Sequence, residues 1–255
     1  MNAIRSLLVF IWLVVSLVPF ATVLLISSLF LPNEKVWWWF AVPWLKGVVE
    51  AARIIAGVKY RVQGEEHLPA AQDMRRVVLA SKHQSTWETF FFPSMMPHPL
   101  AYVFKKELLR IPFFGWCIGA VQMIHIDRSK RSQAWAKVAE QGRVLMDRGK
   151  WIIMFPEGTR TLRGSKGQYK IGAARLAVDT GACVIPIAVT SGRCWPARTF
   201  SFTPGMIDVS IGPPLDVQGR DPDELMAAVE AWIEAEMHRL DPEAYPVTNS
   251  IEQGN

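Results

Sequence analysis

A histidine and a glutamate stand close together in residues 81–88, where four residues separate His83 from Glu88. The apolar run before them, Val77–Ala80, is typical of a buried strand, and a helical pattern follows it. A glutamate in the first turn of that helix can reach back to one nitrogen of the imidazole. There a carboxylate fixes the tautomer and stabilises the imidazolium that forms when the other nitrogen accepts a proton. The pair therefore suits general-base chemistry, although a surface ion pair beside an ordinary helix cap has the same pattern.

A turn rich in functional groups follows a second apolar run, Trp151–Phe155, at residues 155–160 (Phe-Pro-Glu-Gly-Thr-Arg). Proline and glycine favour a tight turn at the end of a strand. Such a turn would present Arg160, whose guanidinium carries a fork of donors that fits a phosphate group. Lys105 and Lys106 follow a third apolar run and could hold a phosphate as point charges. An ordinary strand-ending turn with a solvated arginine is the alternative interpretation of the segment.

The elements that must position these groups alternate along the chain between short apolar runs and helical patterns. The runs are rich in valine and isoleucine, as buried strands are. This alternation predicts an α/β fold with an open, mostly parallel sheet flanked by helices. Functional sites in such folds lie at the carboxyl ends of strands, where both segments stand. The predicted strands are Val58–Val62, Val77–Ala80, Ala101–Phe104, Gln122–Ile126, Trp151–Phe155, Val184–Val189 and Asp208–Ile211, and the predicted helices are Thr86–Met95, Gln133–Asp147, Tyr169–Asp179 and Pro222–Leu240.

The start of the chain has a different composition, because no side chain from Ser6 to Asn33 is charged. A helix that spans a bilayer needs about 20 apolar residues, and the stretch Leu7–Leu31 has that length. A cleaved signal peptide is the rival interpretation, but its apolar core has only about 7–15 residues and ends in small residues. Four of the 11 tryptophans then fall within Trp37–Trp44, and tryptophan favours the headgroup boundary of a membrane. We expect a membrane-anchoring helical hairpin, with one helix in the bilayer and a return helix at the interface.

Positive charge is concentrated in the middle of the chain. The protein has 28 basic and 23 acidic residues, and residues 103–175 hold 15 of the basic but only 5 of the acidic ones. Such a segment favours a phosphorylated substrate or an anionic membrane surface. A nucleic-acid partner is disfavoured, because no known nucleic-acid-binding pattern accompanies the charge. Basic residues just after the apolar stretch outnumber Arg5 before it, which places the following domain on the cytoplasmic face of the inner or cell membrane.

Four segments occur together in the order and spacing of a known family: His83 with an acid five residues on, Lys106-Glu107-Leu108 with Ile111-Pro112 and Gly115, residues 155–160, and Val184-Ile185-Pro186-Ile187. They resemble the four blocks of the glycerolipid acyltransferases, specifically the 1-acyl-sn-glycerol-3-phosphate (lysophosphatidic acid) acyltransferases, over residues 58–212. Ile126-Asp127-Arg128 is similar to the element that follows the second block. Two positions depart from the family pattern. Glu88 stands where the first block usually has Asp, and Lys82 stands where Asn usually precedes the histidine.

The resemblance implies an acyltransferase that makes phosphatidic acid. It would move an acyl chain from acyl-CoA or acyl carrier protein to the sn-2 hydroxyl of 1-acyl-sn-glycerol 3-phosphate, a membrane lipid. His83 would remove the hydroxyl proton and Glu88 would orient His83. The substrate-binding residues would be Lys105, Lys106, Glu157, Gly158, Thr159 and Arg160, of which Arg160 and the lysines would hold the phosphate and Glu157 and Gly158 would shape the acceptor pocket. No metal is expected, because no His/Cys ligand cluster occurs, and the acyl donor is a co-substrate rather than a cofactor.

Several alternatives have the same sequence features. A related acyltransferase with another acceptor, such as glycerol 3-phosphate or another lysophospholipid, would carry the same blocks. A non-catalytic membrane lipid carrier would share the anchor and the basic segment, but it has no need of the His83–Glu88 pair. Cys117 as a covalent acyl carrier is less favoured than a buried, reduced thiol. We expect three parts: a membrane-anchoring helical hairpin over 1–57, an α/β acyltransferase domain over 58–240 and a C-terminal tail over 241–255.

Overall fold

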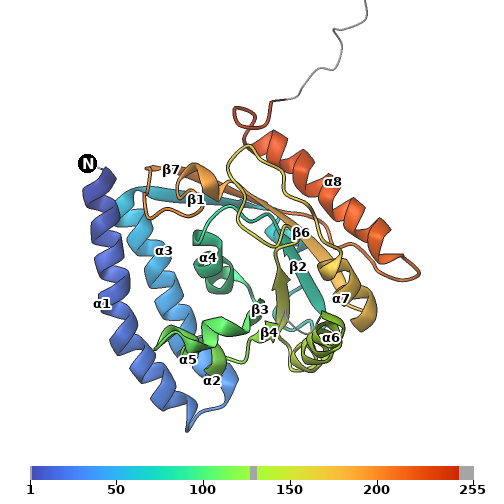
Figure 1. Cartoon of the computed structure of the whole chain (residues 1–255), viewed down its shortest axis with the longest axis horizontal. Helices are drawn as coiled ribbons and strands as arrows, with labels where there is room; N and C mark the ends of the chain where they lie inside the picture. Colours follow the sequence, from blue (N-terminus) through green and yellow to red (C-terminus); the bar gives the residue numbers. More distant parts are fainter. Residues whose placement is uncertain (1, 127–130, 247–255) are drawn as a thin grey trace, which may run out of the picture.

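The N-terminal region is helical and packs along one side of the protein (Figure 1). The computed structural model describes residues 2–126 and 131–246. For residues 105 and 131–134 it describes only the backbone. Glycine at position 57 ends the region in a left-handed conformation, with φ of 72°, which it adopts without the steric penalty of a Cβ atom. The elements are α1 (Asn2–Ser28), α2 (Asn33–Val36), a π-helical turn (Trp37–Ala41) and α3 (Val42–Ala56).

Seven strands form one mixed, mostly parallel sheet in the order β1-β7-β6-β2-β5-β3-β4. Each neighbouring pair runs parallel except β6 and β7, which are antiparallel. Every predicted strand is present, and the α/β sheet flanked by helices is confirmed. The strands are β1 (Val58–Gln63), β2 (Val77–Ser81), β3 (Leu100–Lys105), β4 (Ile124–Ile126), β5 (Trp151–Met154), β6 (Cys183–Val189) and β7 (Gly205–Ile211).

Helices cover both faces of this sheet (Figure 1). On one side lie α1, α3 and α4 (Trp87–Met95), and on the other lie α6 (Arg131–Asp147), α7 (Gly172–Thr180) and α8 (Pro222–Leu240). Alternate residues of a strand point to opposite faces, so Leu79 packs with the first set of helices while Val78 and Ala80 pack with the second. This burial on both faces explains the unbroken apolar runs of the central strands β2, β5 and β6. The short helix α5 (Phe114–Ala120) lies between β3 and β4 in the chain.

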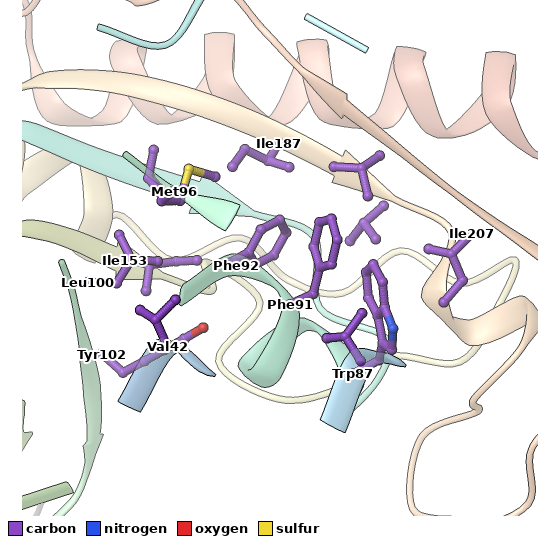
Figure 2. Close-up of a cluster of buried hydrophobic side chains, with 14 of the residues drawn as sticks. Val42, Trp87, Phe91, Phe92, Met96, Leu100, Tyr102, Ile153, Ile187 and Ile207 are labelled. Carbon is purple, nitrogen blue, oxygen red and sulfur yellow. The ribbon is translucent and has the colours of Figure 1, made fainter. Parts of the chain in front are cut away.

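Helix α4 contributes much of the aromatic bulk on the first face. Trp87, Phe91 and Phe92 project from it toward the sheet, where Ile187 and Ile207 meet them (Figure 2). Trp87 and Phe91 stack with 4.1 Å between ring centroids, and all three aromatic residues are at most 1% exposed. Burial of side chains this large is worth about 1.5–3 kcal/mol each. The start of α4 is therefore held firmly against the ends of the strands.

The tryptophan-rich segment differs from its prediction. Trp37 is buried in the core, and the indole N–H of Trp44 donates to the Ser16 hydroxyl at 3.1 Å, which joins α3 to α1. Trp39, in contrast, is 59% exposed. Two of the four tryptophans thus fill space between helices rather than mark a headgroup boundary. Among the described helices, α1 alone has the length and composition to cross a membrane, and the membrane-embedded hairpin remains a prediction.

The segment after α8 packs against the rest of the protein as far as residue 246. Asp241 is fully buried and accepts hydrogen bonds from both Arg163, at 2.7 Å, and Arg193, at 2.9 Å. Tyr245 is 5% exposed. The remainder of the predicted tail, 247–255, lies outside the described residues, so the three-part division of the chain stays a prediction.

Candidate active site

The parallel pairing of β2 with β5 brings the first and third sequence segments together. Residues 78–80 lie opposite residues 152–154 in register, so both segments leave the sheet at the same edge. The backbone N–H of Thr161 donates to the carbonyl of His83 at 2.8 Å, and the Thr161 hydroxyl donates to the same carbonyl at 3.2 Å. The histidine is therefore attached directly to the segment that carries Arg160.

The two oxygens of the Glu88 carboxylate have different hydrogen-bond partners. Its Oε1 accepts the backbone N–H groups of Gln84 at 2.9 Å and Ser85 at 3.0 Å, together with the hydroxyl of Ser191. Its Oε2 pairs with Nδ1 of His83. A negative group at a helix N-terminus also interacts favourably with the helix dipole. The Glu88 side chain is fully buried and that of His83 is 13% exposed, so the alternative of a surface ion pair is wrong.

The backbone and ring of His83 are held from several sides. Its N–H donates to Oε2 of Glu157 at 3.2 Å, opposite the two bonds from Thr161 to its carbonyl. Its ring stacks on Phe155, with 3.8 Å between centroids and 14° between planes. With Nδ1 engaged by Glu88, the tautomer that keeps its proton on Nδ1 leaves Nε2 as the basic nitrogen. The arrangement is suited to accepting a proton at one fixed position.

His83 lies in the wall of an apolar cavity of about 360 Å³. The cavity lies between the N-terminal helices, α4 and the β3–α5 region, and the hydroxyls of Thr86 and Thr89 are among its few polar groups. A base beside such a cavity can act on a molecule whose apolar part is held away from water. The aliphatic and aromatic lining comes mainly from Leu17, Phe20, Leu24, Trp37, Trp44, Leu45, Phe90, Phe104, Leu108, Phe114 and Ile118.

Positive charge gathers at the turn after β5. Arg160 donates to the hydroxyl of Thr86, which lines the cavity together with His83. Gly158 adopts a φ of 67°, and a Cβ atom there would lie only 2.8 Å from the Nζ of Lys170. Lys170 thus supplies a second cation to the turn that carries Arg160. Lys170 belongs to the basic segment 103–175, but it is not among the predicted site residues, because it stands outside the four blocks.

The other predicted substrate-binding residues have different surroundings. Thr159 and Gly158 are exposed at the turn. Lys106 is exposed at the start of the 3₁₀ turn Lys106–Arg110. Lys105 ends β3, but its side chain is outside the described residues, as is Arg128. Glu157 is only 4% exposed, and both of its oxygens accept hydrogen bonds from the protein itself.

Cys117 also lines the cavity, but its thiol is poorly suited to carry an acyl group. Burial raises the pKa of Cys117 to about 11, and the thiolate rather than the thiol is the nucleophile. At neutral pH the sulfur therefore stays protonated. Among the residues that the structure describes, no group of three or more histidine, cysteine or acidic side chains could hold a metal ion.

Comparison with known proteins identifies the family of this chain. Residues 59–190 match the family model named Acyltransferase. The chain is 36% identical, over 94% of its own length and 93% of the relative's, to the 1-acyl-sn-glycerol-3-phosphate acyltransferase of Pseudomonas aeruginosa. The chain belongs to the acyltransferase family. It is also 31% identical, over 68% of its own length and 71% of the relative's, to the 1-acyl-sn-glycerol-3-phosphate acyltransferase of Escherichia coli K12.

The fold of this acyltransferase also resembles a solved structure. The crystal structure of the 1-acyl-sn-glycerophosphate acyltransferase from Thermotoga maritima matches it with a TM-score of 0.79, covering 94% of this chain and 96% of that one. The sequence identity is 23%, so this likeness concerns the fold. It covers a larger share of the chain than the residues matched by the family model.

The protonated state of Cys117 gives a test of the covalent-carrier alternative. We predict that the acyltransferase quenched in acid during turnover has the mass of the unmodified chain. Alkylation of Cys117 by iodoacetamide should rise about tenfold per pH unit until the pH approaches the pKa of about 11, since only the thiolate reacts. Peptide mass spectrometry measures both quantities, with a small-molecule thiol as reference. An acyl thioester on Cys117 in the quenched sample would contradict direct transfer of the acyl chain from the donor to the acceptor.

Proposed function

We propose that the protein is a 1-acyl-sn-glycerol-3-phosphate acyltransferase that makes phosphatidic acid from lysophosphatidic acid and an acyl thioester. The observation that carries the proposal is the 36% identity with the Pseudomonas aeruginosa enzyme over nearly the whole of both chains. The position of His83 supports it, because a histidine backed by a buried carboxylate lines an apolar cavity. The acyl donor is the thioester of CoA or of acyl carrier protein.

His83 acts as the general base in this proposal. Its Nε2 accepts the proton of the acceptor's sn-2 hydroxyl while the hydroxyl oxygen attacks the thioester carbonyl. The tetrahedral intermediate then collapses, the carbon–sulfur bond breaks, and the imidazolium returns the proton to the leaving thiolate. Glu88 stabilises the imidazolium through Nδ1. A positioned base of this kind contributes about 10²–10⁴-fold to the rate, and the fixed position of the two substrates supplies much of the remainder.

The cavity and the turn after β5 bind different parts of the substrates. The apolar cavity holds an acyl chain, because the burial of each methylene group contributes about 0.8 kcal/mol to binding. The acceptor's phosphate binds Arg160, with Lys170 near the same turn and Lys105 or Lys106 as additional cations. Guanidinium and ammonium groups together suit a phosphate, the first by its fork of donors and the second as a point charge. The acceptor hydroxyl is thereby brought to Nε2 of His83.

The N-terminal helices attach the enzyme to the membrane in which its acceptor resides. Side chains along α1 are exposed and apolar, among them Ile11 at 46%, Val15 at 66% and Ile26 at 55%. An exposed apolar surface of this extent marks a membrane or protein contact. Helices α1 and α3 pack side by side and together form the membrane-embedded hairpin of residues 1–57. The basic residues that follow support a position of the acyltransferase domain on the cytoplasmic face, against anionic headgroups.

A panel of acceptors and donors tests the proposed reaction. The purified full-length protein is incubated with either acyl-CoA or acyl carrier protein thioester and with one acceptor at a time. Lysophosphatidic acid should give phosphatidic acid at a higher kcat/KM than glycerol 3-phosphate or lysophosphatidylcholine. Preferred use of another acceptor would assign the protein to a related acyltransferase, and no product with any acceptor would favour a lipid carrier.

Substitution of Glu88 tests the dyad. In Glu88→Gln the side-chain carbonyl can still accept the backbone N–H groups at the start of α4, but the amide NH₂ would face Nδ1 of His83. The proton would then move to Nε2, and the base would be lost. We predict a fall in kcat of about 10²–10⁴-fold, as for the wrong tautomer in hydrolases, with a circular dichroism spectrum like that of the parent. Glu88→Asp is the matched control and should retain far more turnover. Equal turnover in Glu88→Gln and the parent would show that the carboxylate has no part in the reaction.

Substitution of Arg160 tests where the phosphate binds. Arg160→Ala should raise the KM for lysophosphatidic acid by about tenfold or more, because a charge-assisted hydrogen bond is worth about 1.5–3 kcal/mol. The KM for the acyl donor should change little. Arg175→Ala, at an exposed position that pairs with Asp179, is the control for loss of a positive charge. A rise only in the donor KM of Arg160→Ala would refute its role in phosphate binding.

A further inference from the structure

Lys82 is a fully buried lysine next to the candidate base, and the proposed reaction gives it no role. It follows β2 directly and precedes His83. Its Nζ donates to Oε1 of Glu157 at 2.8 Å, to Oε1 of Glu234 at 2.8 Å and to the carbonyl of Ser165 at 3.1 Å. All three protons of the ammonium group therefore have acceptors. This satisfies the group completely, as burial of a charge requires.

Glu157 connects this lysine to His83. Its Oε1 accepts from Lys82 at 2.8 Å and from the backbone N–H of Gly167 at 2.8 Å, while its Oε2 accepts the backbone N–H of His83 at 3.2 Å. The Thr161 hydroxyl also approaches Oε2, at 3.3 Å. The carboxylate is thus oriented by the lysine on one oxygen and holds the histidine with the other.

Glu234 extends the same cluster to the C-terminal helix. It lies on α8, 152 residues from Lys82 in the chain, and its Oε1 also accepts the hydroxyl of Tyr169 at 2.7 Å. The rings of Tyr169 and Tyr245 each lie 5.9 Å from Nζ of Lys82, at the distance of a cation–π contact. Three distant parts of the chain therefore converge on one ammonium group.

We propose that Lys82 is a positioning residue for acyl transfer: through its buried ion pair with Glu157 it holds the backbone of His83 and couples that backbone to α8. The inference rests on the proposed function, because it concerns the placement of the base in that reaction. A misplacement of about 1 Å in a reacting group can lower a rate about 10²-fold. Loss of the ion pair frees Glu157 to turn, and the N–H of His83 loses its acceptor.

Three variants of the full-length protein test the proposal. Lys82→Met removes the ammonium and keeps an unbranched side chain, but it leaves two carboxylates without their cation. The double variant Lys82→Met/Glu234→Gln avoids this excess of negative charge. With all groups ionised, the parent cluster has one cation and two anions, which is a net charge of −1. The double variant also has a net charge of −1. Lys166→Met is the control. It removes an exposed lysine that forms an ion pair with Glu230, which lies on α8 as Glu234 does.

The measurements are kcat, the KM for lysophosphatidic acid and for acyl-CoA, and the thermal midpoint. We expect kcat of the charge-matched double variant to fall about 10–100-fold, while each KM stays within about threefold and the midpoint shows a folded protein. Lys166→Met should keep the kcat of the parent. A change in kcat without a change in KM distinguishes a displaced base from a general loosening of the substrate sites.

Two results would overturn the proposal. One is a folded double variant whose kcat lies within about twofold of the parent. The other is failure of the charge-matched variant to fold, which would assign Lys82 to stability alone. Glu88→Gln measured in parallel separates this proposal from the function on which it rests. If Glu88→Gln is inactive while the Lys82 variants are fully active, only the positioning role fails, whereas full activity of Glu88→Gln would remove the dyad itself.

Discussion

The parallel pairing of β2 with β5 is the constraint on which the rest of the site depends. It places the carboxyl ends of two strands side by side, although about 70 residues separate them along the chain. His83 follows one strand and Phe155 the other, so their rings can stack. The same register lets Thr161 bond to the carbonyl of His83. Without this pairing the base would sit on an unsupported loop.

The site also contains several charges in places that water does not reach. Glu88, Lys82 and Glu157 are each at most 4% exposed. Buried charges are tolerated when they are paired and fully hydrogen-bonded, and here each carboxylate oxygen of Glu88 and Glu157 has a donor. Such saturation leaves few alternative arrangements of the side chains. The result is a histidine whose position is fixed before any substrate arrives, which is the condition for a high effective concentration.

Much of the fold could be predicted from the sequence, because it follows from local patterns. The seven strands and four of the helices are continuous or periodic apolar runs, and α8 even begins with the Asp221 cap and proline expected of a helix start. The antiparallel direction of β7 and the helix α5 were not predicted. Strand direction depends on pairing with distant partners, and α5 has only seven residues, rich in glycine and aromatic side chains.

The candidate site was only partly visible in the sequence for the same reason. His83 and Glu88 are neighbours in the chain, so their pairing could be foreseen. Ser191, which bonds to Glu88, is 103 residues away, and Glu234, which bonds to Lys82, is 152 residues away. A hydroxyl or a carboxylate on a different element has no local signature. The burial of Glu157 likewise depends on Lys82, whose side chain gives no sign in the sequence that it points inward.

The most direct test of the central claim is the turnover of purified His83→Ala with lysophosphatidic acid and acyl-CoA, followed as phosphatidic acid by mass spectrometry. Removal of a general base predicts a kcat lower by about 10²–10⁴-fold, with the thermal midpoint and the KM of the acyl donor close to those of the parent. A folded His83→Ala protein with a kcat within tenfold of the parent would contradict the account.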